Sequence, residues 1–140
     1  FTGQQRKNNK ILNEQDKSTR KSDQEVLESL HYIKKSGYQI LDIVQSGKID
    51  ELGLMFRDHW EMKKKLSSGV TNDKINSIYQ TALDNGALGG KISGAGGGGF
   101  FTFYCNKNHD MLRSAMAAKG LNELDYSFDF DGSKIISNHR

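Results

Sequence analysis

The sequence predicts an α+β domain in which several long helices precede a small antiparallel sheet. The first two-thirds of the chain place apolar residues at helical spacing, and the chain contains no proline. The last third changes to short aromatic or alternating segments, separated by glycines, that are typical of strands. The resulting order is helices first, then strand, strand, helix and strand, which defines an α+β domain.

Length, composition and charge limit the class of protein. A chain of 140 residues suits one domain. With 35% apolar residues and no long apolar run, we expect no membrane association. Because a single cysteine allows no disulfide within the chain, we expect a cytoplasmic location. The 20 basic and 17 acidic residues are interspersed, so we expect no nucleic-acid partner. The single Cys105 excludes an internal disulfide, and because the chain begins at Phe1 we expect it to be a piece of a longer protein.

Four helices are expected before the glycine-rich part of the chain. Residues 4–15 form a polar helix with Ile11 and Leu12 as its apolar anchors, and residues 16–22 form a loop. Asp23 is a plausible N-cap for a long amphipathic helix that Gly47 closes. A third helix covers residues 50–66 and ends at the sequence SSG, and Thr71 or Asn72 caps a fourth helix that ends at residues 85–86.

Shorter elements follow. Residues 91–93 are strand-like, and residues 100–105 form an aromatic strand whose nearly continuous apolar character predicts cover on both faces. Residues 106–119 predict another helix. Residues 126–130 alternate and predict a strand with one buried face, after which Asp131 and Gly132 predict a turn that lets Ile135 and Ile136 pair back.

The chemistry is concentrated in a glycine-rich segment. Of the 15 glycines in the chain, eight lie between Gly86 and Gly99, and the six residues after Ser93 are all glycine or alanine. Without bulky side chains, successive backbone N–H groups can converge on an anion. Ser93 adds a hydroxyl and Lys91 a cation. The alternative is a glycine-rich hairpin or linker, but linkers are not normally flanked by a helix end and an aromatic strand.

Three familiar glycine motifs do not fit. Residues 94–99 match the pattern GxGxxG of dinucleotide-binding proteins. That motif must open a helix, however, and here a strand follows. A Walker A motif needs Ser or Thr after its lysine, and Ile92 follows Lys91. None of the other elements of protein kinases follows the loop. What remains is a phosphate cradle between two strands.

The segment 91–100, KISGAGGGGF, closely resembles the third signature motif of the GHMP small-molecule kinases, a family that includes the galactokinases, homoserine kinases and mevalonate kinases. The opening FTG followed by Arg6 is similar to the turn that begins the C-terminal half of sugar 1-kinases in this family. Residues 59–67 and 75–91 resemble the D-glycero-D-manno-heptose 7-phosphate kinases, although fucose kinases share several of these features.

The resemblance implies a ferredoxin-like C-terminal domain of a GHMP kinase over residues 1–140, with its first strand truncated. In the family a separate N-terminal domain carries the main ATP loop and the catalytic Asp, and neither occurs in this chain. No catalytic residue is therefore expected here, and the isolated chain is expected to be inactive. The implied reaction transfers a phosphoryl group from ATP, with Mg²⁺, to the anomeric hydroxyl of a heptose 7-phosphate. The missing N-terminal domain is the expected protein partner.

The resemblance also implies two sets of site residues. The expected phosphate-binding loop comprises Lys91, Ser93, Gly94, Ala95, Gly96, Gly97 and Gly98. The expected substrate-binding residues are Arg6, Lys63, Lys64 and Trp60. Arg6 suits a sugar phosphate because a guanidinium pairs with phosphate oxygens, unless it is merely solvated. One of the two lysines is expected to contact substrate, although lysine runs are usually solvated.

Other readings stay open. Trp60 could stack on a sugar, but packing between helices is favoured, and His59 is either a ligand contact or a semi-buried structural residue. His109, Asp110 and Asp125 show no metal spacing, so no structural metal is expected. Two functional alternatives remain beside the heptose kinase. The parent could be another GHMP kinase, of the fucose or mevalonate-pathway type, or the chain could be a non-catalytic binding domain that retains the loop.

Overall fold

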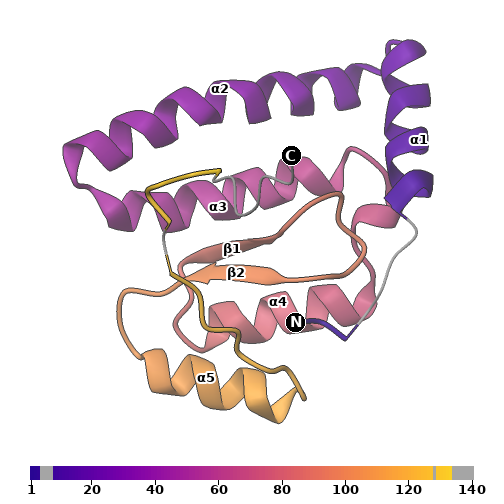
Figure 1. Cartoon of the computed structure of the whole chain (residues 1–140). Coiled ribbons are helices and arrows are strands. Elements are labelled where there is room, and N and C mark those ends of the chain that lie inside the picture. The colour runs from indigo at the N-terminus through magenta and orange to yellow at the C-terminus, as the bar shows by residue number, and fades with distance from the viewer. Residues whose placement is uncertain (4–7, 128, 134–140) are drawn as a thin grey trace, which may run out of the picture.

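A computed structural model describes residues 1–3, 8–127 and 129–133 (Figure 1). The elements in chain order are α1 (Asn8–Arg20), α2 (Gln24–Ser46), α3 (Ile49–Lys64), the short 3₁₀ helix η1 (Ser68–Val70), α4 (Asp73–Asp84), β1 (Gly89–Ile92), β2 (Phe101–Tyr104) and α5 (His109–Ala118). This mostly helical order with one small antiparallel sheet confirms the α+β class.

The elements form layers around the sheet (Figure 1). Helices α2 and α3 run side by side as an antiparallel pair on one side of the two strands, and α4 and α5 lie on the other side. β1 pairs with β2 antiparallel, with Gly89 opposite Tyr104 and Ile92 opposite Phe101. The Ser93 N–H donates to Phe100 O at 2.9 Å and continues the ladder. The glycine-rich segment therefore closes a β-hairpin.

Two glycines let α3 lie directly on β1. A Cβ atom added at Gly89 would lie 2.0 Å from the Gly53 carbonyl oxygen of α3 and 2.8 Å from the Arg57 nitrogen. Such distances are far inside van der Waals contact, so any side chain at residue 89 would push the helix and the strand apart. This close approach fixes the height of α3 above the strand that leads into the glycine-rich segment.

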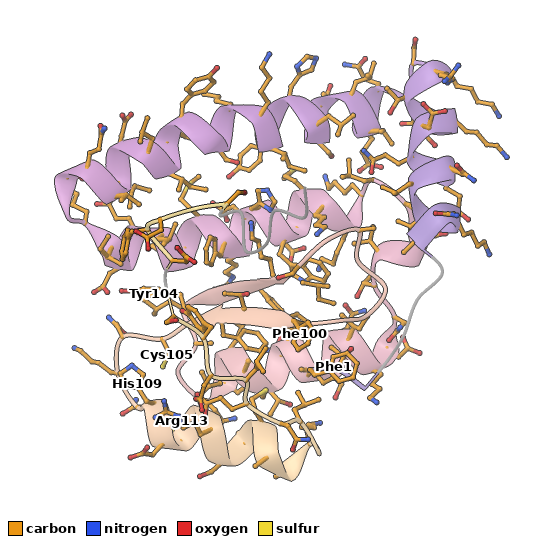
Figure 2. The ribbon with its side chains drawn as sticks, in the orientation of Figure 1. Phe1, Phe100, Tyr104, Cys105, His109 and Arg113 are labelled. Carbon is orange, nitrogen blue, oxygen red and sulfur yellow. The ribbon has the colours of Figure 1, made fainter. Side chains whose placement is uncertain are left out.

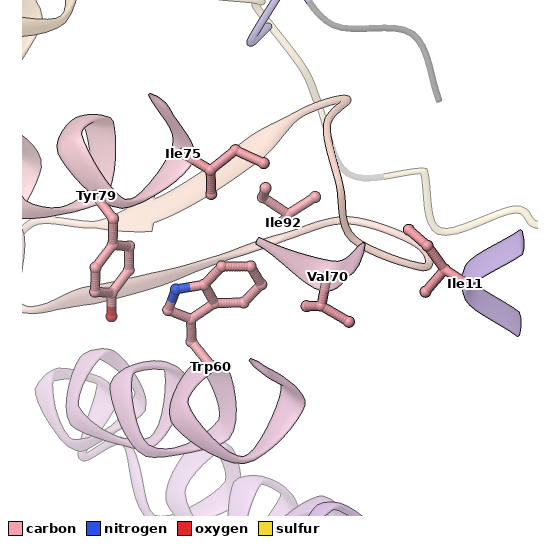
Figure 3. Close-up of a cluster of buried hydrophobic side chains, with 6 residues drawn as sticks. All are labelled: Ile11, Trp60, Val70, Ile75, Tyr79 and Ile92. Atoms are coloured by element: carbon pink, nitrogen blue, oxygen red, sulfur yellow. The ribbon is translucent and has the colours of Figure 1, made fainter. Parts of the chain in front are cut away.

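The hydrophobic core joins the helices to the hairpin (Figure 3). Trp60 of α3 and Ile75 of α4 are fully buried, and they enclose Ile92, the last residue of β1. The rings of Trp60 and Phe101 meet edge to face, with their centroids 6.1 Å apart. Val70, Tyr79 and Ile11 complete the cluster. The core thus anchors both ends of the hairpin loop and the helices beside it.

The expected helix ends are confirmed at three positions. The Asp23 side chain accepts the Val26 N–H at 3.3 Å and caps α2, which ends at Gly47 in the left-handed conformation (φ 73°). The Asn72 side chain accepts the Ile75 N–H at 3.0 Å, so Asn72 rather than Thr71 caps α4.

The boundaries predicted for the first helix are wrong. The expected loop at residues 16–22 is helical as far as Arg20, because polar pairs continue the helix where the apolar pattern stops. Arg20 donates to Asp16 at 2.8 Å, and the Thr19 hydroxyl donates to Gln15 O at 2.9 Å. Residues 4–7, where we expected the helix to begin, lie outside the described part of the chain.

The predicted strand over residues 126–130 is also wrong for its described residues. Tyr126 is 76% exposed and Phe130 is 93% exposed, so neither belongs to a buried strand face. Among the described residues the sheet consists of β1 and β2 alone, so these residues pair with no strand. An alternating pattern without such a partner does not form a stable strand. A turn does form, since Asp129 Oδ1 accepts the N–H groups of Asp131 and Gly132. Residue 128 and the predicted pairing of residues 135–136 lie outside the described part.

The aromatic strand is covered less completely than its composition predicts. Thr102 is exposed, and Phe100 is 44% exposed. An apolar groove of about 530 Å³ runs beside β2 and is lined across it by Leu112 and Met116 of α5. At one end of this groove the ring of Phe1 lies 5.0 Å from that of Phe100 (Figure 2). The expectation of cover on both faces is therefore wrong, because α5 does not close over the strand.

The first residues of the chain lie beside the end of the hairpin. The Thr2 N–H donates to Gly99 O at 2.8 Å, and the Thr2 hydroxyl accepts the Gly99 N–H at 3.0 Å. Thr2 is almost fully buried. The N-terminus thus helps to hold the last residue of the glycine-rich segment. Within the described residues, none of the helices combines the length and the apolar character needed to span a bilayer.

Candidate functional site

The candidate site is the loop of residues 93–99 between β1 and β2. Gly94 (φ 77°) and Gly96 (φ 102°) adopt the left-handed conformation that L side chains rarely adopt. The glycine run therefore has a conformational cause, because other residues at these positions would strain the turn. This requirement accounts for part of the concentration of glycines between Gly86 and Gly99.

The far side of the loop is packed against η1. A Cβ atom at Gly96 would lie 2.8 Å from Val70 O, and one at Gly97 would lie 2.8 Å from Gly69 O. The Gly97 N–H donates to Val70 O at 2.6 Å. Glycine is thus needed here for close approach as well as for conformation, and the contact fixes the loop on the short helix between α3 and α4.

A count of backbone donors shows which part of the loop is open. The N–H groups of Ser93, Gly97 and Gly99 donate within the protein, to Phe100 O, Val70 O and the Thr2 hydroxyl. Among the described residues, the N–H groups of Gly94 and Ala95 have no acceptor. Ser93 and Gly94 are also exposed. Two adjacent free N–H groups beside an exposed serine form a position that an anion such as a phosphate can occupy.

Lys63 reaches the loop from α3. Its ammonium group donates to Ile92 O at 2.8 Å and also to Gly94 O. The sequence predicted a substrate contact for Lys63, whereas the contacts in the structure are with the loop backbone. The signal that could have indicated this is its position on the apolar stripe of the helix, which turns its side chain toward the sheet.

Lys91 and His59 lie on the α3 side of β1. The ammonium of Lys91 lies 5.2 Å from the centroid of the Phe56 ring, within reach of a cation–π interaction. Burial, together with the nearby positive charges of Lys91 and Lys63, lowers the pKa of His59 to about 4. The Nδ1 atom of His59 is buried and has no hydrogen-bond partner among the described residues. Lys63 and Lys91 thus place two positive charges near His59, which stays neutral at neutral pH.

Of the other three expected substrate residues, the structure describes Trp60 and Lys64. Trp60 is fully buried in the core, which agrees with the favoured interpretation that it packs and does not stack on a sugar. Lys64 pairs with Glu61 at 2.8 Å, and within the described part of the chain it makes no hydrogen bond or ion pair with the loop. Arg6 lies outside the described residues. Among the described residues no three His, Cys, Asp or Glu side chains gather into a metal-binding group.

The lowered pKa of His59 leads to a prediction for the pH dependence of stability. In the unfolded chain the His59 side chain binds a proton near pH 6.5, whereas in the folded protein it does so only near pH 4. Between these values the unfolded state holds more protons, so the free energy of unfolding falls as the pH drops from 6.5 to 4. Because the side chain is partly exposed, we expect a loss of about 1–2 kcal/mol. Urea denaturation at several pH values measures it.

The matched variants for that measurement are His59→Gln and His31→Gln. We expect His59→Gln to flatten the decline, whereas His31→Gln, at an exposed position of α2, should preserve it. An unchanged decline in His59→Gln would show that other groups control the acid sensitivity.

Comparison with known proteins assigns the chain to a class. Residues 40–122, more than half of the chain, match the family described as GHMP kinases C terminal. This segment includes α3, α4, the hairpin and the loop of residues 93–99. The chain therefore belongs to the GHMP kinases and contains their C-terminal domain, as the resemblance of its glycine motif indicated.

The chain is also similar in sequence to a characterised kinase. The chain is 32% identical over 123 residues to the D-glycero-alpha-D-manno-heptose 7-phosphate kinase of Campylobacter jejuni. The matched region is 86% of this chain but 36% of that kinase. The similarity thus extends over nearly all of the chain, which spans about a third of its relative.

Proposed function

We propose that this chain is the C-terminal part of an ATP-dependent cytoplasmic sugar kinase that phosphorylates the anomeric hydroxyl of a heptose 7-phosphate. Family membership supports kinase chemistry in the parent protein, and the similar heptose 7-phosphate kinase supports this class of acceptor. The observation in the structure that carries the proposal is the pair of free N–H groups at Gly94 and Ala95, beside the exposed Ser93.

The loop would act by positioning and by charge compensation. Phosphoryl transfer depends mainly on holding the reacting groups in line and on stabilising the charge that develops on the phosphate oxygens. The N–H groups of Gly94 and Ala95 would donate to phosphate oxygens, and the Ser93 hydroxyl would add a further hydrogen bond. Because η1 and the Thr2 side chain hold the loop, these donors would be fixed before the ligand binds.

The described residues fit the phosphates of ATP better than they fit Mg²⁺. The free N–H groups suit phosphate oxygens, whereas Mg²⁺ prefers carboxylate oxygens and water, and the described residues contain no group of three His, Cys, Asp or Glu side chains that could hold a metal ion. The Mg²⁺ ligands and the catalytic base would come from the N-terminal domain of the parent, which is the proposed partner of this domain. The bound metal would neutralise negative charge on the nucleotide phosphates.

The test of the proposal is an acceptor panel with the longer parent protein. We expect ADP formation that depends on a heptose 7-phosphate and is at least about tenfold slower, in kcat/KM, with fucose or mevalonate. A preference for fucose or mevalonate would assign the protein to another branch of the family. Nucleotide or sugar binding without turnover would indicate a non-catalytic binding domain. The 140-residue chain alone should show no turnover, because it lacks the ATP loop and the base.

A second prediction concerns Arg6. If its guanidinium holds the phosphate of the acceptor, Arg6→Ala in the parent should raise the KM for the sugar phosphate about tenfold or more. The KM for ATP should change little, since the lost contact is to the acceptor. Steady-state kinetics with each substrate varied in turn make the measurement, and Arg20→Ala, at the exposed end of α1, is the control. Equal effects on both KM values would contradict this role.

A further inference from the structure

We propose that Lys63 is a positioning residue: its ammonium group sets the conformation of the loop in which the Gly94 and Ala95 N–H groups face a ligand. For its role in catalysis this inference rests on the proposed function. The observation is that Lys63 Nζ, on α3, donates to the carbonyl oxygens of both Ile92 and Gly94, which are 29 and 31 residues away in sequence. One cation thus joins the end of β1 to the start of the loop.

Peptide geometry links these carbonyls to the free donors. In a trans peptide the C=O and the following N–H point in opposite directions. Because the Gly94 carbonyl points toward Lys63, the N–H of Ala95 must point away from it. The same geometry at Ile92 turns the Ser93 N–H toward Phe100 O, where it is bonded at 2.9 Å. The ammonium therefore selects the orientation of the peptide group whose N–H is free.

Lys63 contacts the loop, whereas the two lysines that follow it in the sequence pair with acidic residues. Lys64 pairs with Glu61 at 2.8 Å, and Lys65 lies 3.4 Å from Glu25 of α2. Of three consecutive lysines, it is thus Lys63 that reaches the loop. The close packing of Gly53 on Gly89 holds α3 at the distance from β1 that this contact requires.

The contact between Lys63 and the loop also restricts the backbone conformation of the loop. Glycines have the largest choice of backbone conformations, so a glycine-rich loop loses much conformational entropy when it is ordered. Hydrogen bonds to a charged donor are stronger than those between neutral groups, and two of them from one ammonium can offset part of that loss. The same ammonium places a positive charge behind the donors, which favours an anion on their open side.

Amide hydrogen exchange of the ¹⁵N-labelled 140-residue chain, followed by NMR, tests the inference without any need for kinase activity. The variants are Lys63→Met, which keeps the length but not the charge, Lys63→Arg, and the matched control Lys64→Met. In Lys63→Met we expect the amides of Ser93 and Gly97 to exchange about tenfold faster or more. Core amides of α4, such as that of Ala82, should keep their rates. Lys63→Arg should restore most of the protection, and Lys64→Met should change nothing.

Two results would overturn the inference. One is unchanged exchange of the loop amides in Lys63→Met. The other is an equal acceleration in α4, which would show that Lys63 supports the whole domain and not the loop. If Lys63→Met does not fold, Lys63→Gln gives the same comparison, because its side chain keeps a polar group but is too short to reach both carbonyls.

Kinetics of the longer parent then separate positioning from substrate contact. Positioning predicts that Lys63→Met lowers kcat about 100-fold while the KM for the sugar phosphate stays within about twofold. A direct substrate contact would instead raise that KM, and would contradict the inference. A wild-type parent without sugar-dependent turnover would refute the proposed function, whereas the exchange experiment would still decide whether Lys63 sets the loop.

Discussion

Replacement of Trp60 by alanine is expected to lower the free energy of unfolding by about 3–5 kcal/mol, the usual cost of removing a fully buried tryptophan. Trp60 is 0% exposed, and its ring lies 6.1 Å from the ring centroids of both Tyr79 and Phe101. Its loss would leave a cavity where α3, α4 and the hairpin meet (Figure 3). Because Trp60 is the single tryptophan in the chain, unfolding should be followed by far-ultraviolet circular dichroism in urea.

Tyr38→Ala is the control for this measurement. Tyr38 is an aromatic residue of a helix that is 68% exposed, so its removal should change stability by less than about 0.5 kcal/mol. A loss below about 1 kcal/mol in Trp60→Ala would show that the interior is not packed around this ring. If Trp60→Ala preserves the fold but alters the affinity of the parent for the sugar, Trp60 contacts the substrate, contrary to its burial in the core.

Gly96→Val in the longer parent is expected to lower kcat by about 100-fold or more, because the loop would be displaced by about 1 Å. A Cβ atom at residue 96 would lie 2.8 Å from both Val70 Cγ1 and Val70 O, and φ is 102°. Overpacking and backbone strain together should lower the free energy of unfolding by about 2–4 kcal/mol. Activity assays and urea denaturation of the same preparation measure both effects.

Gly37→Val is the matched control for that substitution. A Cβ atom at Gly37 on α2 meets nothing within 4 Å, so both stability and kcat should be preserved. Wild-type turnover in Gly96→Val would contradict the role of the loop in catalysis. Lost turnover with unchanged stability would contradict the packing of the loop on η1.

The loss of stability expected for Gly96→Val is larger than the sequence alone predicts. The glycine-rich loop lies outside the apolar stripes of the helices, which suggests that a substitution there costs little stability. The contact with Val70 and Gly69 is invisible in the sequence, because it joins two segments that have no periodic pattern in common. Glycine patterns do predict backbone freedom, but they do not reveal which neighbouring backbone makes that freedom necessary.

Local signals explain what could be predicted of the fold. Asp23, Gly47 and Asn72 mark helix ends through side-chain or backbone chemistry that acts within a few residues. The predictions for Asp23 and Gly47 are confirmed, and Asn72 is one of the two caps predicted for α4. The strand predicted over residues 126–130 failed because a strand is stable only beside a partner, and alternation does not report whether a partner is present. The extension of α1 to Arg20 was not predicted, because the polar pairs that continue the helix have no apolar stripe.

The candidate site could be predicted from the sequence only in part, because local patterns do not show contacts between distant segments. The loop itself is a contiguous motif, so its residues could be named from sequence. The apolar stripe of the helix indicates that Lys63 turns inward. Its contact with Ile92 and Gly94 depends on the packing of α3 on β1, which the sequence does not show. Trp60 was open to two interpretations, since tryptophan is common both in cores and at sugar sites.

Amide hydrogen exchange of the longer parent, measured with and without ATP and Mg²⁺, tests most directly whether the loop holds phosphate. The N–H groups of Gly94 and Ala95 have no acceptor among the described residues, so a phosphate bound there should slow their exchange about tenfold or more. The amides of α2, which lies on the far side of α3 from the sheet, should be unaffected (Figure 1). Unchanged exchange at Gly94 and Ala95 under conditions where the nucleotide is bound would contradict the phosphate-binding role of this loop.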